Sequence, residues 1–477
     1  MNIVLINAPY LDIYGSLNVG KNFNFPLGIG YIAGMLKKNG HTVAILEPEI
    51  YEMTAEDVVD YIKERSADIV GITCATANFK GAEKLARHIK EKLGTFTVIG
   101  GVHASSVPEQ ILLNYPQFDA AVIGEGEYTM LEMCEALEKD RDNLSQVNGI
   151  MFRQKGEIIK TPPRPFIENL DELPFPAREL VDLNNYRPQV HLDRGKKSAT
   201  MITSRGCPAH CTFCASFKTL GFKFRAHSPE YVVSEIEHLV KNYNIEHVIF
   251  VDDTFTIQPE RVKKICNLMI EKNLKIDWYC FARVVPISKE ILQLMKKAGC
   301  FSLLFGVESA DPQVLKNVKK GITPEQATKA FELSNELGFK TIATFILGLP
   351  GDTKETIEKT INFAVKLKPT IASFNRLVPF PGTEIYETYY QSKFEDGKHW
   401  DDFVPKAANP VIELEGVSTQ ALQKLTNVAY MRFYLRPSQI VKILLSIKTF
   451  GEFRAYMRGA YGLFRRMAQW RKAAVRY

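Results

Sequence analysis

Short apolar runs alternate with helical patterns along residues 1–140. The apolar runs predict five strands, at Ile3–Ala8, Thr42–Glu47, Asp68–Thr73, Thr97–Gly101 and Ala120–Gly124. Apolar positions at helical spacing predict five helices between and after them, at Leu27–Asn39, Ala55–Arg65, Lys80–Leu93, Val107–Leu113 and Tyr128–Leu137. This alternation is typical of a parallel sheet covered by helices on both faces. We therefore predict a flavodoxin-like or Rossmann-like α/β domain.

The alternation returns over residues 197–395, in six units. The predicted strands are Ala199–Thr203, His247–Asp253, Trp278–Val284, Leu303–Ser309, Thr341–Gly348 and Ala372–Pro379. The predicted helices are Tyr231–Lys241, Pro259–Glu271, Lys289–Ala298, Pro324–Glu336, Glu355–Leu367 and Glu384–Tyr390. In a parallel barrel the functional side chains gather at the carboxyl ends of the strands. The segments that follow these strands are therefore candidates for one site.

Two other stretches complete the predicted organisation into residues 1–140, 141–196, 197–395 and 396–477. Residues 141–196 predict a linker, with a hairpin at Gly149–Thr161 followed by a proline-rich strap. Proline fixes φ, so we expect the strap to run extended across a surface. Residues 396–477 begin with the polar stretch His399-Trp400-Asp401-Asp402 and continue as helical segments.

The composition limits the class of protein. The chain has 477 residues, of which 45% are hydrophobic, as expected of a soluble protein with two or three domains. No apolar run approaches the ~20 residues of a membrane-spanning helix, and the N-terminus shows no signal peptide. The cysteines Cys74, Cys134, Cys266, Cys280 and Cys300 are scattered among apolar residues, as reduced core thiols would be. We therefore expect a cytoplasmic protein.

The remaining three cysteines, Cys207, Cys211 and Cys214, lie within eight residues just after a predicted strand. Three thiolates on one loop can bind three irons of a cubane and leave the fourth iron open to a small molecule. A structural zinc site is the alternative, but zinc usually takes four protein ligands, and His210 inside the loop is cramped as a fourth.

This loop resembles the signature of the radical S-adenosylmethionine (SAM) enzymes, which has the same cysteine spacing and an aromatic residue, here Phe213, before the last cysteine. The resemblance implies a [4Fe-4S] cluster on Cys207, Cys211 and Cys214, with SAM bound to the open iron. It also implies reductive cleavage of SAM to a 5′-deoxyadenosyl radical. Because six βα units accompany the loop, we expect the incomplete (β/α)6 barrel of that family.

The resemblance extends to the residues after the later strands. An acidic pair stands where the family binds the SAM amino group, and a cation follows the next strand, where arginine suits a carboxylate. A Gly-x-Glu-Ser element follows the fourth strand and a Gly-Leu-Pro turn the fifth. The SAM-binding residues implied are Asp252, Asp253, Arg283, Glu308, Ser309, Gly348 and Pro350, together with Phe213.

The N-terminal domain resembles the cobalamin-binding domain that precedes one large class of radical SAM enzymes. Small and glycine-rich segments follow its strands, so backbone can approach a flat ligand. The cobalamin-binding residues implied are Asn7, Pro9, Tyr10, Thr73, Gly100, Gly101, His103, Gly124, Glu125 and Gly126. One departure is that the loop Tyr10–Gly15 lacks the histidine that ligates cobalt in many cobalamin domains. We therefore expect cobalamin to bind base-off, without a protein histidine on cobalt.

These resemblances imply a cobalamin-dependent radical SAM methyltransferase that methylates an unactivated carbon, most simply on a hydrophobic small molecule or lipid. The reaction implies an electron donor such as flavodoxin or ferredoxin. The alternative is a cyclase or ring-rearranging enzyme that acts on a tetrapyrrole or lipid without methylation. A tRNA methylthiotransferase is disfavoured, because the N-terminal domain has only Cys74 and Cys134 and cannot ligate a second cluster.

The C-terminal segment is strongly basic. From residue 431 onward it carries eleven basic residues and one acid, Glu452, interleaved with aromatic residues. This pattern predicts a segment that lies on anionic lipid at the inner face of the membrane. A helix that packs its aromatic residues on the barrel is the alternative, and nucleic-acid binding is disfavoured.

Overall fold

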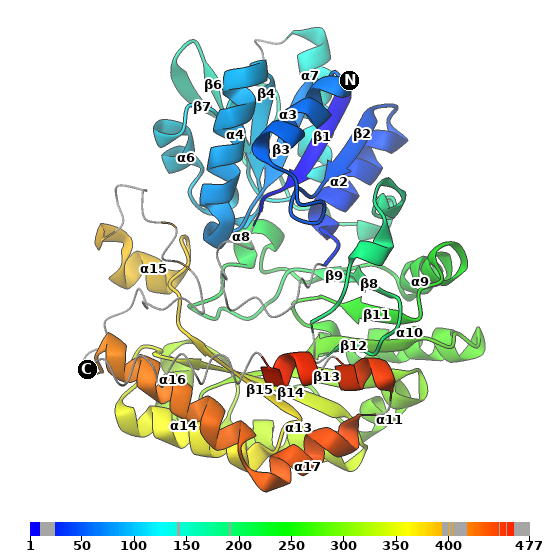
Figure 1. The fold of residues 1–477 in the computed structure, drawn as a ribbon, viewed down its shortest axis with the longest axis vertical. Coiled ribbons are helices and arrows are strands. Elements are labelled where there is room, and N and C mark those ends of the chain that lie inside the picture. The colour runs from blue at the N-terminus through cyan, green and yellow to red at the C-terminus, as the bar shows by residue number, and fades with distance from the viewer. Residues whose placement is uncertain are drawn as a thin grey trace.

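Two sheets of mainly parallel strands organise the chain. The structure is a computed structural model and describes residues 1–9, 24–140, 144–189, 192–393, 400, 403, 417–447, 449–454 and 456–461. The first sheet lies at the top of Figure 1 and the second below it, with the C-terminal helices beneath the second sheet. Both predicted α/β regions are therefore present, together with the predicted helical C-terminal region.

The first sheet has seven strands in the order β2-β1-β3-β4-β5-β6-β7. Its strands are β1 (Asn2–Asn7), β2 (Thr42–Leu46), β3 (Ile69–Thr73), β4 (Phe96–Gly100), β5 (Ala120–Val122), β6 (Ile150–Gln154) and β7 (Glu157–Lys160). Strands β1 to β5 are parallel, while β6 and β7 are antiparallel. The hairpin expected in the linker thus extends this sheet as β6 and β7.

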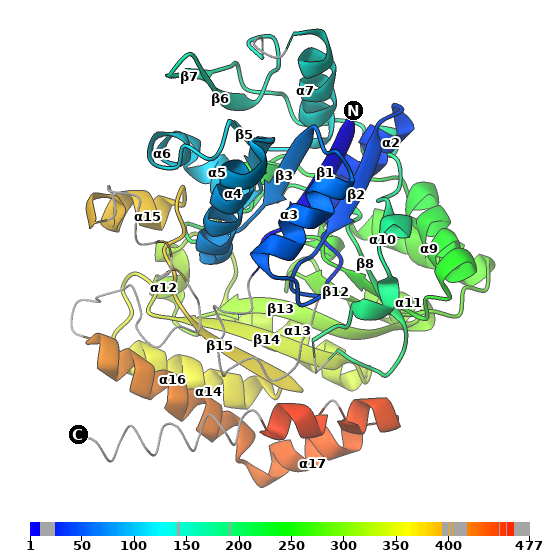
Figure 2. The ribbon, with the colours of Figure 1, turned by 45° about the horizontal axis from the view of Figure 1, so that its top comes forward.

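Helices cover both faces of the first sheet (Figures 1 and 2). They are α2 (Leu27–Lys38), α3 (Ala55–Glu64), α4 (Phe79–Leu93), α5 (Val102–Ser106), α6 (Pro108–Asn114) and α7 (Glu127–Lys139). Alternate residues of β1 point to opposite faces, because a strand has a period of two. Ile3 and Leu5 pack with α2 and α7, whereas Val4 and Ile6 pack with α3 and α4.

The second sheet has six parallel strands in the order β15-β14-β13-β12-β11-β8, so the two outer strands are β8 and β15. Its strands are β8 (Ser198–Met201), β11 (His247–Phe250), β12 (Asp277–Ala282), β13 (Cys300–Glu308), β14 (Lys340–Leu347) and β15 (Ile371–Arg376). The short strands β9 (Ser204–Arg205) and β10 (Arg225–Ala226) pair with each other beside it. The arrangement is the expected partial (β/α)6 barrel.

Helices pack on the outer face of the second sheet. They are α9 (Pro229–Tyr243), α10 (Pro259–Glu271), α11 (Lys289–Lys297), α12 (Pro312–Asn317), α13 (Pro324–Glu336) and α14 (Lys354–Leu367). The outward side chains of β12, Trp278 and Cys280, belong to the main core, whereas Tyr279 lies in a small cluster with Ile249 and Ile342. The bounds of α10 and α13 agree with the sequence prediction. The short helices α5, α8 (Phe217–Leu220) and α12 were not predicted, because four to six residues carry little periodicity.

Three further helices follow the barrel: α15 (Glu384–Tyr389), α16 (Thr419–Tyr434) and α17 (Pro437–Ser446). Residues 450–454 and 456–461 are also helical. Short 3-10 turns occur at Thr76–Asn78, Leu170–Glu172, Arg178–Leu180, Leu183–Asn185, Phe255–Ile257 and Gln391–Lys393. No helix among the described residues is long and apolar enough to cross a bilayer.

The proline-rich strap fills the junction between the two sheets. The Ala177 amide donates to the Gly30 carbonyl in α2 at 3.0 Å. The neighbouring Arg178 is buried and pairs with Glu235 of α9 at 2.7 Å. The main hydrophobic core therefore continues from the first sheet, through the strap, into the barrel.

Substitution of Gly101 tests how closely the backbone of the β4–α5 turn approaches its neighbours. Its φ of 95° and ψ of −174° lie in a region that only glycine occupies, and an added Cβ would lie 2.5 Å from the Cys74 carbonyl oxygen. We expect Gly101→Ala to cost about 3 kcal/mol, from backbone strain and overlap together. Urea unfolding followed by circular dichroism measures the loss.

The matched control is Gly94→Ala at the end of α4. Gly94 also has positive φ, at 65°, but nothing lies within 4 Å of an added Cβ. Strain alone then costs about 1 kcal/mol. Equal losses in the two variants would contradict the close approach at Gly101.

Candidate active site

The three cysteines lie on the loop that joins β9 to α8. Cys207, Cys211 and Cys214 are half-buried and free of disulfides. Backbone bonds fix the loop, because the Cys207 amide donates to the Gly221 carbonyl at 3.3 Å and the Thr212 amide donates to the Val318 carbonyl at 3.1 Å. The loop is thus held between α8 and the segment after α12, at the carboxyl end of the barrel.

Burial disfavours the thiolate form of Cys211 and Cys214. It raises the pKa of Cys214 to about 11, and it also raises the pKa of Cys211 against the opposing effect of Lys320 and Arg283. Iron binds the thiolate, so cluster binding must release the thiol protons. Three free thiols on one loop, with two cations facing it, suit the ligands and the charge of an iron–sulfur cluster. Among the described residues, no group of three or more His, Cys, Asp or Glu could hold a single metal ion.

The acidic pair after β11 divides into two different environments. Asp252 is fully buried and accepts from the Thr203 amide at 3.0 Å and from the Thr203 hydroxyl at 2.7 Å. Its carboxylate therefore joins the end of β11 to the segment that leads into the cysteine loop. Asp253 accepts from the Ser216 hydroxyl and lies near Cys214. Burial raises the pKa of the Asp252 carboxyl group.

A buried ion pair lies beside the cysteine loop. Glu308 ends β13 with a φ of 66°, and its Oε1 lies 2.8 Å from Nζ of Lys320. The same ammonium lies 5.8 Å from the centre of the Phe213 ring. Burial acts to lower the pKa of Lys320, but Glu308 and Cys211 outweigh it, so the pKa is raised and the ammonium stays charged. Gly306 leaves room for the pair, because a Cβ there would lie 2.6 Å from Glu308 Oε1.

Arg283 reaches the same region from β12. Its Nη2 donates to the Lys320 carbonyl at 3.2 Å, which brings both cations and Glu308 together near Cys211. The sequence prediction included Arg283 and Glu308 but missed Lys320. Nothing in the sequence marks Lys320, since it is one of two adjacent lysines in a loop, and its neighbour Lys319 is exposed.

The remaining predicted SAM residues belong to tightly bonded turns. The Gly348 and Leu349 amides both donate to Asp352 Oδ2 at 2.9 Å, and burial raises the pKa of Asp352 to about 6. The Pro350 carbonyl accepts from the Asn317 side chain at 3.0 Å. Ser309 points toward α14, where its hydroxyl lies 3.3 Å from that of Thr360. Ser309 is thus directed away from the Glu308–Lys320 pair.

A cavity of about 300 Å³ opens at the carboxyl ends of the first sheet. The predicted cobalamin residues that line it are Thr73, Gly100, Gly101, Gly124, Glu125 and Gly126. Apolar side chains of β1, α2 and β4 form much of its wall. The barrel closes the cavity with Ile202, Arg205, Thr219 and Leu220, which flank the cysteine loop in sequence. The cavity and the cysteine loop therefore share a wall.

Other predicted cobalamin residues lie away from this cavity. Asn7 donates to Glu47 at 3.0 Å, and the Pro9 carbonyl faces Gly81 of α4. His103 is fully buried between Phe79 and Trp400, with ring centres 4.5 and 4.9 Å away. Burial lowers the pKa of His103 to about 3, so the ring stays neutral.

No histidine is among the described residues that line the cavity. Base-off binding of cobalamin without a histidine ligand stays a prediction. Tyr10 and the rest of the loop to Gly15 lie outside the described residues, as do His399, Asp401 and Asp402.

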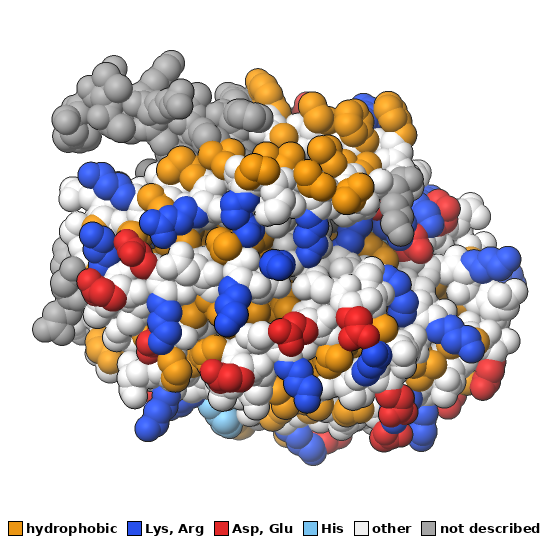
Figure 3. Space-filling model, turned by 90° about the horizontal axis from the view of Figure 1, so that it is seen from below, with side chains coloured by type: hydrophobic (Ala, Val, Ile, Leu, Met, Phe, Trp, Pro, Cys, Tyr) orange, Lys and Arg blue, Asp and Glu red, His pale blue; other side chains and the backbone are white. Residues whose placement is uncertain are grey.

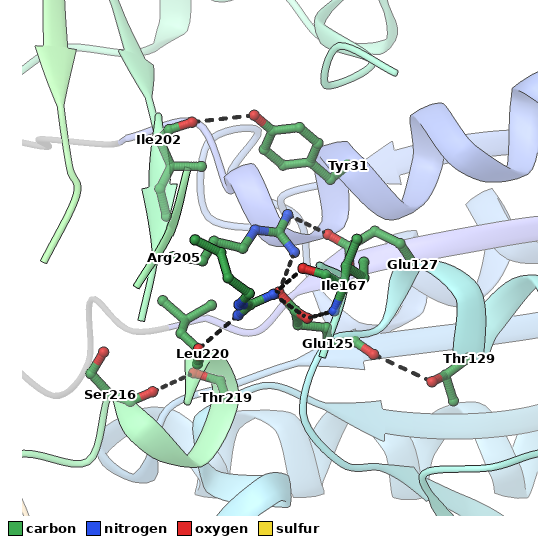
Figure 4. A network of polar contacts seen from close by, with 11 residues as sticks. Tyr31, Glu125, Glu127, Thr129, Ile167, Ile202, Arg205, Ser216, Thr219 and Leu220 are labelled. Carbon is green, nitrogen blue, oxygen red and sulfur yellow. Dashed lines mark hydrogen bonds and ion pairs between the residues drawn. The ribbon is translucent and has the colours of Figure 1, made fainter. Parts of the chain in front are cut away.

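Four buried charges join the two sheets at the shared wall (Figure 4). Arg205 contacts Glu125 at 2.8 Å and Glu127 at 2.6 Å, and Arg225 contacts Glu125 at 2.9 Å. The side chains are at most 5% exposed, so the pairs are removed from water. Arg225 also donates to the Ile167 carbonyl at 2.6 Å. Glu125, expected as a cobalamin residue, thus lines the cavity and also binds both arginines, which the sequence prediction missed.

Comparisons with known proteins agree with this geometry. The model of the radical SAM superfamily matches residues 201–364, and the model of the B12 binding domain matches residues 17–133. A Pyrococcus horikoshii protein described as an uncharacterized methyltransferase is 35% identical over 420 residues, or 87% of this chain and 89% of that protein. The chain belongs to the cobalamin-binding radical SAM family.

A second relative and a solved structure are also similar to this chain. The anaerobic magnesium-protoporphyrin IX monomethyl ester cyclase of Rubrivivax gelatinosus is 31% identical over 81% of this chain and 70% of its own length. The solved structure of OxsB with aqua-cobalamin and SAM bound has a TM-score of 0.72 and 20% identity, over 99% of this chain and 71% of that one. The fold and the cofactors predicted from the sequence, namely SAM, a [4Fe-4S] cluster and cobalamin, are thereby confirmed.

The charges at the shared wall can be tested with Glu125→Gln. Glutamine keeps the shape of Glu125 but leaves Arg205 and Arg225 with a single carboxylate, Glu127, among the residues of this network. We expect a loss of about 3 kcal/mol in unfolding free energy, since a buried charge loses its partner. Urea unfolding measures the loss, and cobalt per chain after reconstitution should fall with it.

Glu168→Gln is the control, because Glu168 pairs with Lys223 on the exposed surface beside the same wall. Both stability and cobalt content should stay at the parent level in this variant. A Glu125→Gln variant that also matched the parent in both measurements would contradict the role given to the buried charges.

Proposed function

We propose that this enzyme transfers a methyl group to an unactivated carbon of a small, apolar molecule. The observation that carries the proposal is the shared wall, where the cobalamin-type cavity and the cysteine loop meet across Ile202, Arg205, Thr219 and Leu220. One substrate placed at this wall could reach both cofactors. The 35% identity to a protein described as a methyltransferase supports methylation as the outcome.

The cysteine loop is proposed to hold the cluster through Cys207, Cys211 and Cys214. When bound, the cluster and SAM supply a 5′-deoxyadenosyl radical, and cobalamin supplies the methyl group. The protein then has to align these groups and exclude water. The backbone bonds that fix the loop and the apolar wall of the cavity serve these two tasks. The electron needed at the cluster comes from a donor of the flavodoxin or ferredoxin kind.

SAM is proposed to bind among the charges at the ends of β12 and β13. Arg283 and Lys320 provide two cations for its carboxylate, and Glu308 provides an acceptor for its ammonium or ribose. Glu308 pairs with the Lys320 ammonium in the structure. SAM binding would exchange part of this internal pairing for contacts to a ligand that carries both charges. The turn at Gly348–Pro350 is fixed in shape by Asp352 and suits the adenine side.

An apolar substrate is supported by the aromatic residues around the cysteine loop. Phe217 and Phe222 stack with ring centres 4.6 Å apart, and His210 stacks on Phe222 at 4.2 Å. Phe222 remains 37% exposed, so this stack offers an apolar surface next to the cysteines. Stacked aromatic rings favour contacts with flat or apolar molecules.

A ring-forming reaction without methylation is the second candidate. It is supported by the 31% identity to the anaerobic magnesium-protoporphyrin IX monomethyl ester cyclase. The two candidates use the same cofactors and the same shared wall. They differ in where the methyl group of SAM goes.

The proposed SAM site can be tested with Lys320→Met. Loss of the ammonium removes a contact to the SAM carboxylate and leaves Glu308 buried without its partner. We expect the Kd for SAM to rise by about 10- to 100-fold, as for the loss of a charged hydrogen bond. Calorimetry on the reconstituted protein measures Kd, with iron per chain unchanged. Lys319→Met, which removes the exposed neighbour that pairs with Glu384, should bind SAM as the parent does.

Methyl transfer can be separated from ring formation without knowing the substrate. The reduced protein with its cofactors is incubated with SAM that carries a trideuterated methyl group. We expect the label to appear in the corrinoid extracted from the protein, with S-adenosylhomocysteine formed alongside, as measured by mass spectrometry. Reductive cleavage of SAM with no label in the corrinoid would refute methyl transfer and favour the second candidate.

A further inference from the structure

Helix α17 buries a polar side chain against the barrel and exposes its apolar side chains. Its one buried side chain is Gln439, whereas Ile440, Val441, Leu444 and Leu445 are between 46% and 77% exposed. A helix that packs on a soluble domain usually buries its apolar stripe and exposes its polar one. On α17 the apolar stripe faces outward, so the contact with the barrel does not explain it.

Side-chain hydrogen bonds hold α17 in this orientation. Gln439 donates to the Pro369 and Thr370 carbonyls at 3.3 and 2.8 Å, just before β15. Lys442 donates to the Lys368 carbonyl and to the Asn335 side chain. These bonds come from the face of α17 that meets the barrel. Rotation of the helix to bury its leucines would break them.

The apolar surface continues beyond α17. Ten of the seventeen exposed large hydrophobic side chains among the described residues lie between 431 and 461, so the exposure is concentrated in this segment. The later ones include Phe450 (75% exposed), Met457 (56%) and Tyr461 (62%). The view from below shows a broad apolar patch with Lys and Arg side chains along its border (Figure 3). We call this patch the underside face; it consists of Met431, Leu435, Ile440, Val441, Leu444, Leu445, Phe450, Phe453, Met457 and Tyr461.

The C-terminal segment that carries the underside face is strongly basic, although one of its cations, Arg458, pairs with Asp193 at 3.0 Å. Residues 417–477 contain twelve Lys and Arg residues and one acid, Glu452. Glu452 is buried and pairs with Arg194 at 3.2 Å and with Lys340 at 2.9 Å. Two copies of so basic a face would repel each other, whereas an anionic surface would be attracted.

A basic cavity opens beside the underside face. It has a volume of about 540 Å³, and its lining includes Arg194, Lys296, Lys340 and Lys442 together with Val441 and Leu445 of α17. The described residues that line it include no acid. Burial and the nearby Lys368 and Arg436 lower the pKa of Lys442. Arg194 and Lys340 share Glu452, and Arg194 also contacts Asp277 at 2.9 Å. An anionic group in this cavity would therefore be attracted mainly by Lys442 and Lys296, and an apolar chain attached to it would lie on Val441 and Leu445.

We infer that the underside face docks on an anionic phospholipid bilayer, with a lipid phosphate in the basic cavity and acyl chains against α17. The cavity lies at the amino ends of the barrel strands, next to Lys340 at the start of β14. The cysteine loop lies at the opposite, carboxyl ends. Docking therefore leaves the site away from the lipid, and the inference is independent of the reaction proposed above.

Vesicle flotation of the full-length protein with its cofactors tests the inference. We expect the protein to float with phosphatidylcholine vesicles that contain about 30% phosphatidylglycerol and to stay behind with pure phosphatidylcholine. The double variant Leu444→Glu and Leu445→Glu should lower the bound fraction at least about tenfold, because it places charge in the apolar layer. Lys442→Glu should lower it as well, through the basic cavity.

Leu113→Glu is the matched control, because Leu113 is 63% exposed on α6, far from α17 in the chain, and should bind vesicles like the parent. Iron and cobalt per chain, and the Kd for SAM, should equal the parent values in every variant, which shows that each is folded. Any one of three results would overturn the inference. The first is equal flotation with neutral vesicles, and the second is unchanged flotation of both α17 variants. The third is a parent protein that sediments as a dimer and a leucine double variant that sediments as a monomer.

Discussion

The burial of two carboxylates against two guanidinium groups between the two sheets is the constraint on which the site depends. The first domain supplies the carboxylates of Glu125 and Glu127, and the barrel supplies the guanidinium groups of Arg205 and Arg225. An isolated charge in such a place costs several kcal/mol, so each side needs the other in one position. Arg205 lies two residues before Cys207. The same pairs that close the interface therefore also place the cysteine loop against the cavity.

Charged residues near the cysteines serve two different purposes. Asp252 accepts hydrogen bonds from the amide and the hydroxyl of Thr203. It therefore fixes the segment that leads into the cysteine loop, and the oxygen that accepts these bonds is not open to a ligand. Glu308 and Lys320 instead satisfy each other beside the loop, at the edge of the barrel. A pair of this kind keeps both charges available, because a zwitterionic ligand can replace either contact with one of its own. Asp252, Glu308 and Lys320 are all buried or nearly so, and they differ in the partners to which they are hydrogen-bonded.

The sequence predicted the fold well because each element is decided locally. Helices α10 and α13 begin at Pro259 and Pro324, which favour the first turn of a helix, and their predicted bounds agree with the structure. The cysteine loop and Glu308 could also be singled out as candidates, since a strand end followed by a motif is a local signal, and the structure places Glu308 near Cys211. Lys320 and Arg225 were missed because their roles depend on contacts between distant segments. Arg225 meets Glu125 across 100 residues of chain, and no local pattern reports such a contact.

The C-terminal region also shows that a local sequence pattern does not reveal which distant segments a helix contacts. Its sequence indicated aromatic and basic residues on helices, and two interpretations, packing on the barrel or contact with lipid, were open. In the structure, Tyr430 and Tyr434 of α16 bond to the backbone of β15, as packing on the barrel predicts. The leucines of α17 face outward instead, which leaves them open to the proposed contact with lipid. The eight residues of β14 span about 26 Å at the usual rise, which separates this face from the cysteines. The proposed lipid contact therefore concerns where the protein lies, and the basic segment gives no information on the substrate.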